Sequence, residues 1–286
     1  MTAVGLALCS AVLFGSLSIT LGFALRRHPD PEAGALATAL VALVPCLLIA
    51  LAGEKWSFGV WPFLLAGLLA PGSSQIFYVL AIRDAGPSRT AVLVGMAPLV
   101  SVTIAFVGLS EPVSAALILG AILIVLGGVV LAGERVRPET FRGVGVAFAL
   151  AAATLFATRD NVVRHFAVQT SVEPQFAAST TLVAGATVMA VYLVARRGPR
   201  QATADTRASL VPFALSGLVW GLSYVTLFEA FYRSRVSVIS PLVATESLFA
   251  VLLAALVLRK SELVSRHLWI GATLVVAGGV LIGVFR

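Results

Sequence analysis

Charged residues are scarce in this sequence. Only 12% of its 286 residues are Asp, Glu, Lys or Arg, against about 25% in an ordinary soluble domain. Hydrophobic residues make up 59% of the chain, and apolar runs of about twenty residues recur from end to end, each long enough to cross roughly 30 Å of hydrocarbon. This composition excludes a soluble globular protein and indicates an integral membrane protein that has the lipid bilayer as a partner.

Motifs of enzyme chemistry are also missing. The sequence has no HExxH metal motif, no GxSxG nucleophile motif and no phosphate-binding loop. The three histidines, His28, His165 and His267, fall in or beside connections, where a buried Ser-His dyad is hard to build. Cys9 and Cys46 sit inside apolar runs without metal-ligand spacing, which favours small buried side chains over redox roles. We expect no enzyme, no metal and no cofactor.

Ten membrane helices are predicted from apolar runs bounded by charged, Pro or Gly breaks. The first run lacks the basic start of a signal peptide and continues to Leu25, so we expect an uncleaved helix. The connections are too short for a soluble domain between the runs. The predicted helices cover residues 3–25, 34–52, 61–82, 88–109, 113–132, 143–165, 174–195, 210–232, 236–258 and 266–285.

The chain contains an internal repeat. The segment "SEPVSAALILGAILIVLGGVVL" from Ser110 matches "SELVSRHLWIGATLVVAGGVLI" from Ser261 at a constant offset of 151. Near the start of each half, "LFGS" from Leu13 matches "LFAT" from Leu155 at an offset of 142. The order of the matches is kept although the offset drifts, so the connections have changed length. We predict two copies of one five-helix unit, residues 1–133 and 143–286.

An odd number of crossings per copy has a geometric consequence. If each copy crosses the membrane five times, the second copy enters from the side opposite the first. The two copies are then related by an axis in the membrane plane, an arrangement typical of secondary transporters with a substrate site near the midplane. The predicted fold is therefore an all-α membrane protein of ten transmembrane helices in two inverted five-helix repeats.

These features resemble the EamA branch of the drug/metabolite transporter superfamily. The resemblance rests on the two-repeat plan, on "LFGS" and "LFAT", and on "ATESLFAVLLAALVLRKSEL" followed by "GATLVVAGGVLIG". The Glu-Pro usual in the ninth helix of such proteins reads Glu246-Ser247 here, and the corresponding place in the first copy reads Ala97-Pro98. The resemblance implies a multi-pass protein of the cell (inner) membrane, a monomer or homodimer, that moves a small-molecule substrate without ATP.

Three functions stay open at this point. The resemblance favours export of an amino acid or a related metabolite by alternating access through a central cavity. A proton-coupled exporter of drugs or cationic compounds is the alternative if Glu246 and Glu229 both face the cavity. A membrane-embedded enzyme or lipid flippase would instead need a lateral groove lined by catalytic polar residues.

The distribution of positive charge bears on orientation. The net charge of +7 comes from short connections and indicates topology, not a nucleic-acid partner. Connections after odd-numbered helices hold 14 Lys and Arg, and the segments on the opposite side of the membrane hold five. The remaining one, Arg159, lies within a predicted membrane helix. The positive-inside rule places both termini outside the cytoplasm, whereas proteins of the resembled family usually have both inside.

Four ionisable residues fall inside predicted membrane helices: Arg159, Asp160, Glu229 and Glu246. Such a residue costs roughly 2.5–3.5 kcal/mol at the helix centre, so it usually faces a cavity or a partner. Arg159 and Asp160 form either a helix-end ion cluster, with Asp160 paired to Arg164, or an inward-facing site. In the second arrangement Arg159 binds an anionic substrate group or pairs with Glu229 or Glu246.

The carboxylates are candidates for proton coupling. Glu229 stands where the first copy has Leu80, and it forms either an interhelical hydrogen bond or a site for a proton or a substrate amine. Glu246 lies near the middle of the ninth helix, where a low dielectric favours the protonated form, so it is the first candidate. Its alternative role is to shape the helix. Asp160 is the third candidate.

Candidate substrate-binding residues surround predicted breaks in the third helix of each copy. In "LLAPGSSQIFY", Pro71 removes a backbone donor, and Ser73, Ser74 and Gln75 either repair the helix or line the site. The matching segment "LVWGLSYVTLF" carries the second predicted break, and paired interruptions of this kind point to a transporter's binding site. Arg159 and an aromatic wall for an apolar or cationic substrate complete the predicted site. That wall consists of Tyr78, Trp220 and Tyr224.

Overall fold

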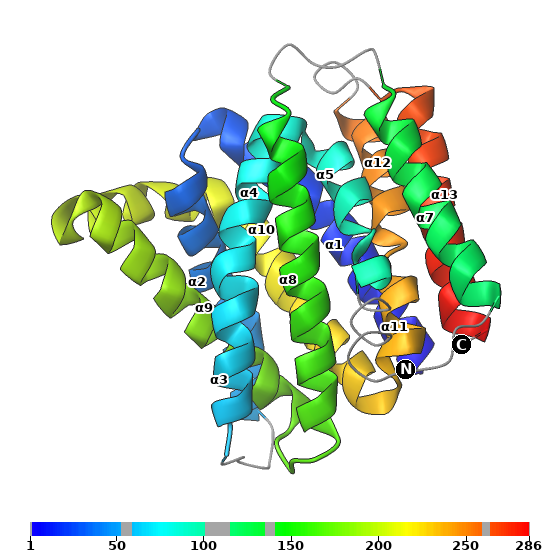
Figure 1. Ribbon diagram of the computed structural model, residues 1–286. Helices are drawn as coiled ribbons and strands as arrows, with labels where there is room; N and C mark the ends of the chain where they lie inside the picture. Colours follow the sequence, from blue (N-terminus) through cyan, green and yellow to red (C-terminus); the bar gives the residue numbers. More distant parts are fainter. Residues whose placement is uncertain (1, 53–58, 101–114, 135–140, 259–263, 286) are drawn as a thin grey trace.

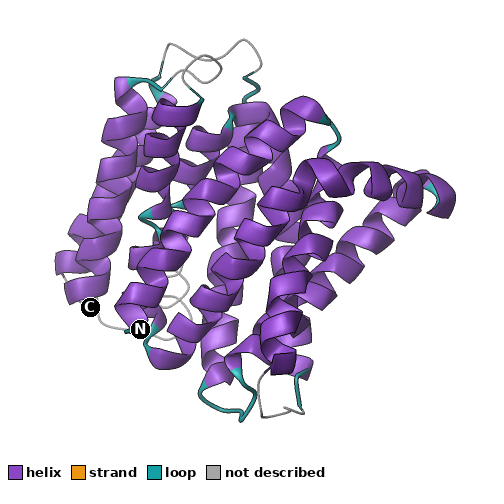
Figure 2. Ribbon diagram, turned by 180° about the vertical axis from the view of Figure 1, so that it is seen from behind, coloured by secondary structure: helices purple, strands orange, loops and turns teal. Residues whose placement is uncertain are grey.

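The computed structural model describes residues 2–52, 59–100, 115–134, 141–258 and 264–285. Every regular element in these ranges is a helix, and seven helices are long and apolar enough to cross a membrane. They pack into one bundle with both chain ends at the same end (Figures 1 and 2). The elements are α1 (Ala3–Arg27), α2 (Pro31–Ala52), α3 (Trp61–Gly67), the π-helical segment η1 (Leu68–Ser73), α4 (Ser74–Ala85), α5 (Pro87–Val94), α7 (Ala115–Ala132), α8 (Val144–Ala167), α9 (Pro174–Arg197), α10 (Pro199–Arg233), α11 (Val236–Val243), α12 (Glu246–Val257) and α13 (Arg266–Phe285).

The all-helical membrane fold agrees with the sequence, but several boundaries differ. The connection predicted after residue 195 is largely helical, because Gly198 (φ 77°) makes the turn and Pro199 starts α10 at once. The predicted helix 88–109 runs beyond α5 into residues outside the described ranges. The predicted break at Ser110 lies there too. Six residues of the orientation argument also lie outside the described ranges: Lys55, Arg135, Arg137, Arg259, Lys260 and Arg286.

The two halves of the chain interlock. α2 packs on α9 and α10, α1 packs on α10 and α12, α4 packs on α8, and α7 packs on α13. Each of these pairs joins one half to the other. Helices in lipid gain no hydrophobic energy from meeting each other, so such packing depends on close van der Waals contact between small residues.

Glycines permit the contact between α7 and α13. A Cβ at Gly278 would lie 2.5 Å from the Gly120 carbonyl oxygen, and a Cβ at Gly127 would lie 2.8 Å from the Gly271 carbonyl oxygen. The backbones of the two helices therefore meet directly at both places.

A buried ion pair joins α5 to Glu134, just after the end of α7. The Arg89 guanidinium, 2% exposed, donates to both carboxylate oxygens of Glu134 at 2.6 and 2.9 Å. The Ser265 hydroxyl, just before α13, also donates to Glu134. Arg89 is thus a structural residue inside α5, although its charge entered the positive-inside count as a connection residue.

A second polar cluster ties the α1–α2 connection to α9 and α10. The Arg197 guanidinium contacts Asp30 at 2.5 Å, Glu32 at 2.8 Å and Asp205 at 2.7 Å. Burial by itself raises the pKa of the Asp30 carboxyl, but hydrogen bonds from Arg197 and from the Ala33 amide outweigh it. The pKa of Asp30 is therefore lowered below its ordinary value, so folding favours its charged form.

We predict that Gly278→Ala destabilises the protein by roughly 1–3 kcal/mol, because the added methyl group forces α7 and α13 apart. Thermal unfolding of the purified protein in detergent measures the change. Gly143→Ala is the matched control, since a Cβ at Gly143 meets no atom within 4 Å. Equal stability of Gly278→Ala and wild type would contradict the direct backbone contact.

We predict that Arg197→Met costs roughly 1–3 kcal/mol at pH 7, between the values for exposed and buried ion pairs. The lowered pKa of Asp30 gives stability that is present at neutral pH and is lost as the pH falls through the folded-state value. The difference between wild type and variant should therefore shrink at acidic pH. Arg196→Met, whose side chain is 63% exposed, should unfold like wild type, and a pH-independent difference would exclude the ion cluster as its cause.

Candidate functional site

A central cavity of about 50 Å³ lies between the two halves. This volume is large enough to hold water. Both halves contribute walls. The lining residues are Phe14, Leu17, Gln75, Tyr78, Val94, Ala97 and Pro98 from the first half, and Phe156, Arg159, Asp160, Trp220, Leu227, Ser240, Val243, Ala244 and Glu246 from the second.

The break in the first copy positions Gln75 and Tyr78. Ala70 has non-helical dihedral angles (φ −144°, ψ 121°) within η1, and α4 restarts at Ser74. Gln75 then faces the cavity with 1% exposure, and neither of its amide atoms has a hydrogen-bond partner among the described residues. Tyr78 shares a hydrogen bond of 2.6 Å with Ser18 of α1. A buried, unpaired amide is the kind of group that a ligand or water satisfies.

Arg159 turns inward, but its partners differ from those expected. Its Nε lies 2.7 Å from Asp160 Oδ1, and its Nη1 donates to the Tyr224 hydroxyl. The guanidinium carbon also lies 5.0 Å from the centre of the Tyr224 ring and within 6 Å of the Phe156 and Phe228 rings. Arg164 does not complete the predicted helix-end cluster; it donates to the Phe231 carbonyl oxygen at 2.6 Å.

Glu246 is the first residue of α12 and lines the cavity with 7% exposure. No ion pair or hydrogen bond joins its carboxyl group to another described residue. Asp160 and Tyr78 are the ionisable neighbours that act on it electrostatically. Glu246 therefore carries the carboxyl group in this cavity that lacks a cation.

The paired breaks occur in the fourth helix of each copy, not in the third. The expected break near Gly221 is absent, because α10 is a continuous helix from Pro199 to Arg233. Gly221 instead lets α10 approach α2, since a Cβ there would lie 2.4 Å from the Ala42 carbonyl oxygen.

The fourth helices change their hydrogen bonding at matching places. The Met96 backbone N–H donates to the Leu93 carbonyl oxygen, and the Thr245 backbone N–H donates to the Leu242 carbonyl oxygen. Both are hydrogen bonds of the tighter i→i−3 type. Such short tight turns inside helices often mark hinges. Val94, Ala97, Val243 and Glu246 on either side of the two turns line the cavity.

The other predicted site residues lie outside the cavity lining. Glu229 forms an ion pair with Arg233 in the last turn of α10, and Gln175 of α9 donates to it at 3.3 Å. Ser73 donates to the Leu68 carbonyl oxygen at 3.4 Å and so repairs the helix break. Ser74 is fully buried without a hydrogen-bond partner among the described residues. Tyr224 does not line the cavity, but its hydroxyl accepts a hydrogen bond from Arg159, which does.

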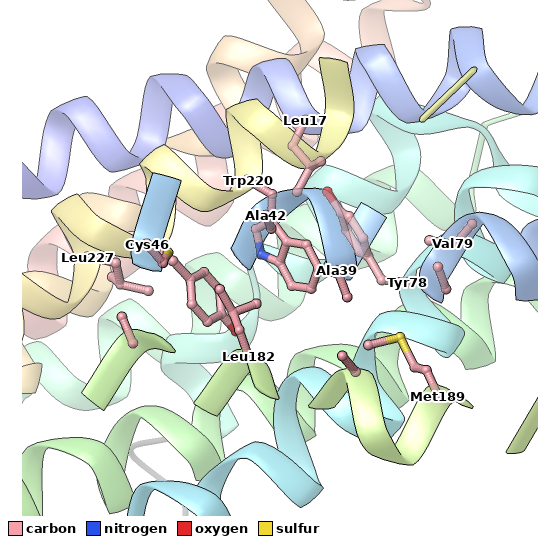
Figure 3. Packing of buried hydrophobic residues seen from close by; sticks show 14 of the residues in the cluster. Leu17, Ala39, Ala42, Cys46, Tyr78, Val79, Leu182, Met189, Trp220 and Leu227 are labelled. Atoms are coloured by element: carbon pink, nitrogen blue, oxygen red, sulfur yellow. The ribbon is translucent and has the colours of Figure 1, made fainter. Parts of the chain in front are cut away.

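Some cavity residues escaped the sequence analysis although a signal was present. Phe14 and Phe156 line the cavity, and they are the aromatic residues of the repeated motifs "LFGS" and "LFAT". Figure 3 shows Leu17, Tyr78 and Trp220 in the packed cluster, and all three also line the cavity. The repeated motif therefore marks two wall positions, which the sequence analysis used only as evidence for the repeat and the resemblance.

Comparison with known proteins agrees with this architecture. A model of the EamA-like transporter family matches residues 1–133 and again residues 143–284. No curated protein matches the sequence. Among 25 solved chains that match, one crystal structure has a TM-score of 0.61 over 99% of each chain at 19% identity, which shows a shared fold. Since the family matches cover nearly the whole sequence, the chain belongs to the EamA-like transporter family.

Proposed function

We propose that the protein is a secondary transporter that moves a small organic solute through the central cavity by alternating access. The observation that carries this proposal is a cavity walled by both halves. It contains the Glu246 carboxyl and the Gln75 amide, which have no partners among the described residues. Unpaired polar groups are costly inside a membrane bundle and are kept where function uses them.

Two inverted copies, residues 1–133 and 143–286, provide the mechanism. Figure 1 supports this arrangement, since α1 and α8, the first helices of the two copies, run in opposite directions. The matching tight turns at Met96 and Thr245 supply hinges at equivalent places. Rocking of one copy against the other then opens the cavity to each side in turn.

The direction of transport is export from the cell across the inner membrane, with an amino acid or a related metabolite as the first expectation and a drug-like cation as the alternative. The cavity lies between helices of both halves, α1, α4, α5, α8, α10, α11 and α12. This location favours a transporter over a lipid flippase or membrane enzyme, which needs a groove open to lipid.

Glu246 is the proposed proton-coupling residue, with Asp160 as its cavity neighbour. We predict that Glu246→Gln abolishes the proton dependence of transport in proteoliposomes while solute binding is retained, because the amide keeps the shape but binds no proton. Glu173→Gln, at the N-terminal cap of α9, is the control and should leave proton dependence intact. Unchanged proton dependence in Glu246→Gln would remove the residue from coupling.

Arg159 and Asp160 form a buried ion pair, with Nε 2.7 Å from Oδ1. Arg159→Met leaves that carboxylate buried and unpaired, and we expect a loss of roughly 3–5 kcal/mol of stability. The double variant Arg159→Met/Asp160→Leu should recover most of the loss, which thermal unfolding measures. A single variant that folds and transports like wild type would show that the ion pair has no role in the site.

A further inference from the structure

More carboxyl groups than cationic groups line the central cavity. Arg159, Asp160 and Glu246 line it, so it carries one positive group and two carboxyl groups. Arg159 is 2% exposed, and its guanidinium is occupied by Asp160 and by the Tyr224 hydroxyl. Three aromatic rings surround it within 6 Å. Arg159 therefore has little left to offer to the carboxylate of a solute.

Glu246 remains without a cationic partner among the described residues. A solute with an ammonium group supplies the missing cation. A solute with a carboxylate places a third carboxyl group beside Glu246 and Asp160, where Arg159 is already paired and no further cation among the described residues lines the cavity. Such unfavourable contacts are a common basis of discrimination. The electrostatics of the cavity thus oppose free carboxylates in general, including that of an amino acid.

Neutral groups in the cavity fit the rest of such a solute. The buried Gln75 amide, unpaired among the described residues, can accept a hydrogen bond from an ammonium group. Trp220, Tyr78 and Phe156 supply aromatic walls that pack against an apolar body and attract a cation. Charge, hydrogen bonding and shape point to the same chemical class.

We infer that the central cavity selects organic cations that carry an ammonium group and no carboxylate. This inference rests on the proposed transport function and narrows it, because it prefers the cation over the amino acid as substrate class. Glu246 is the residue that determines charge selection, and Gln75 contributes a hydrogen bond that does not discriminate charge.

Three probes with the same phenylethyl body test the inference: phenethylamine, phenylalanine and 3-phenylpropionate. Their binding to the full chain in nanodiscs is measured by calorimetry at pH 7. Phenethylamine should bind at least about tenfold more tightly than phenylalanine, as expected for one buried charge contact. Phenylpropionate should show no saturable binding.

Variants separate charge from shape. Glu246→Gln should reduce the preference for phenethylamine over phenylalanine to less than about threefold, and Glu173→Gln should keep the wild-type ratio. Gln75→Glu is nearly isosteric and adds a carboxylate, so it should increase the preference even if Glu246→Gln does not fold. Gln75→Leu should weaken phenethylamine binding and keep the order of the probes.

Several results would overturn the inference. These are binding of phenylalanine or phenylpropionate as tight as that of phenethylamine, binding of none of the probes, or an unchanged ratio in both Glu246→Gln and Gln75→Glu. Uptake by proteoliposomes, measured on the same preparations with a wider solute panel, separates this failure from failure of the proposed function. If phenylalanine or another solute is transported, the transporter stands and only the cation preference is lost.

Discussion

The requirement to compensate buried charge governs the centre of this protein. A charge in hydrocarbon costs several kcal/mol unless it is paired or reaches water. Arg159 meets that requirement through Asp160, Tyr224 and the surrounding aromatic rings. Glu246 lines the same cavity and has no cationic partner among the described residues. Under the proposed function, this difference separates the ionisable groups that pair with each other from the carboxyl group left for a ligand.

The rest of the fold keeps these groups in place. The extensive helix contacts join one half to the other, with glycines such as Gly278 and Gly221 letting backbones meet. Ion clusters around Arg197 and Glu134 fix the helix ends. The tight turns at Met96 and Thr245 interrupt the fourth helices beside the cavity. Under the proposed function, the bundle bends at these two turns when the cavity opens, while the contacts between the halves hold the helices together.

The sequence predicted the helical membrane fold well, because the apolar runs and the repeat depend on composition and order alone. Contacts were harder to predict. Helix rules pair residues three or four apart, and they offered Asp160 with Arg164 as one of two arrangements. In the structure Asp160 pairs instead with its neighbour Arg159. Gly221 resembled a helix break and serves as a contact surface. Such outcomes depend on which helix lies opposite, and one sequence does not specify that.

Six of the predicted site residues line the cavity: Gln75, Tyr78, Arg159, Asp160, Trp220 and Glu246. They share a detectable property, since each is polar or aromatic within an apolar run. Glu229 has the same property, yet it lies one turn from the helix end and pairs with Arg233. Depth in the bundle separates these cases, and helix boundaries from sequence are too coarse to measure it.

Two-sided accessibility of the cavity is the most direct measure of alternating access. Single cysteines at Ala97 and Ala244, which line the cavity from opposite halves, are introduced after Cys9 and Cys46 are replaced. A membrane-impermeant thiol reagent is then applied from each side of sealed vesicles. Labelling from both sides, with a balance that shifts when the proton gradient is reversed, is the expected result. Labelling from neither side under all conditions would show a permanently sealed interior and contradict a transport pathway between the halves.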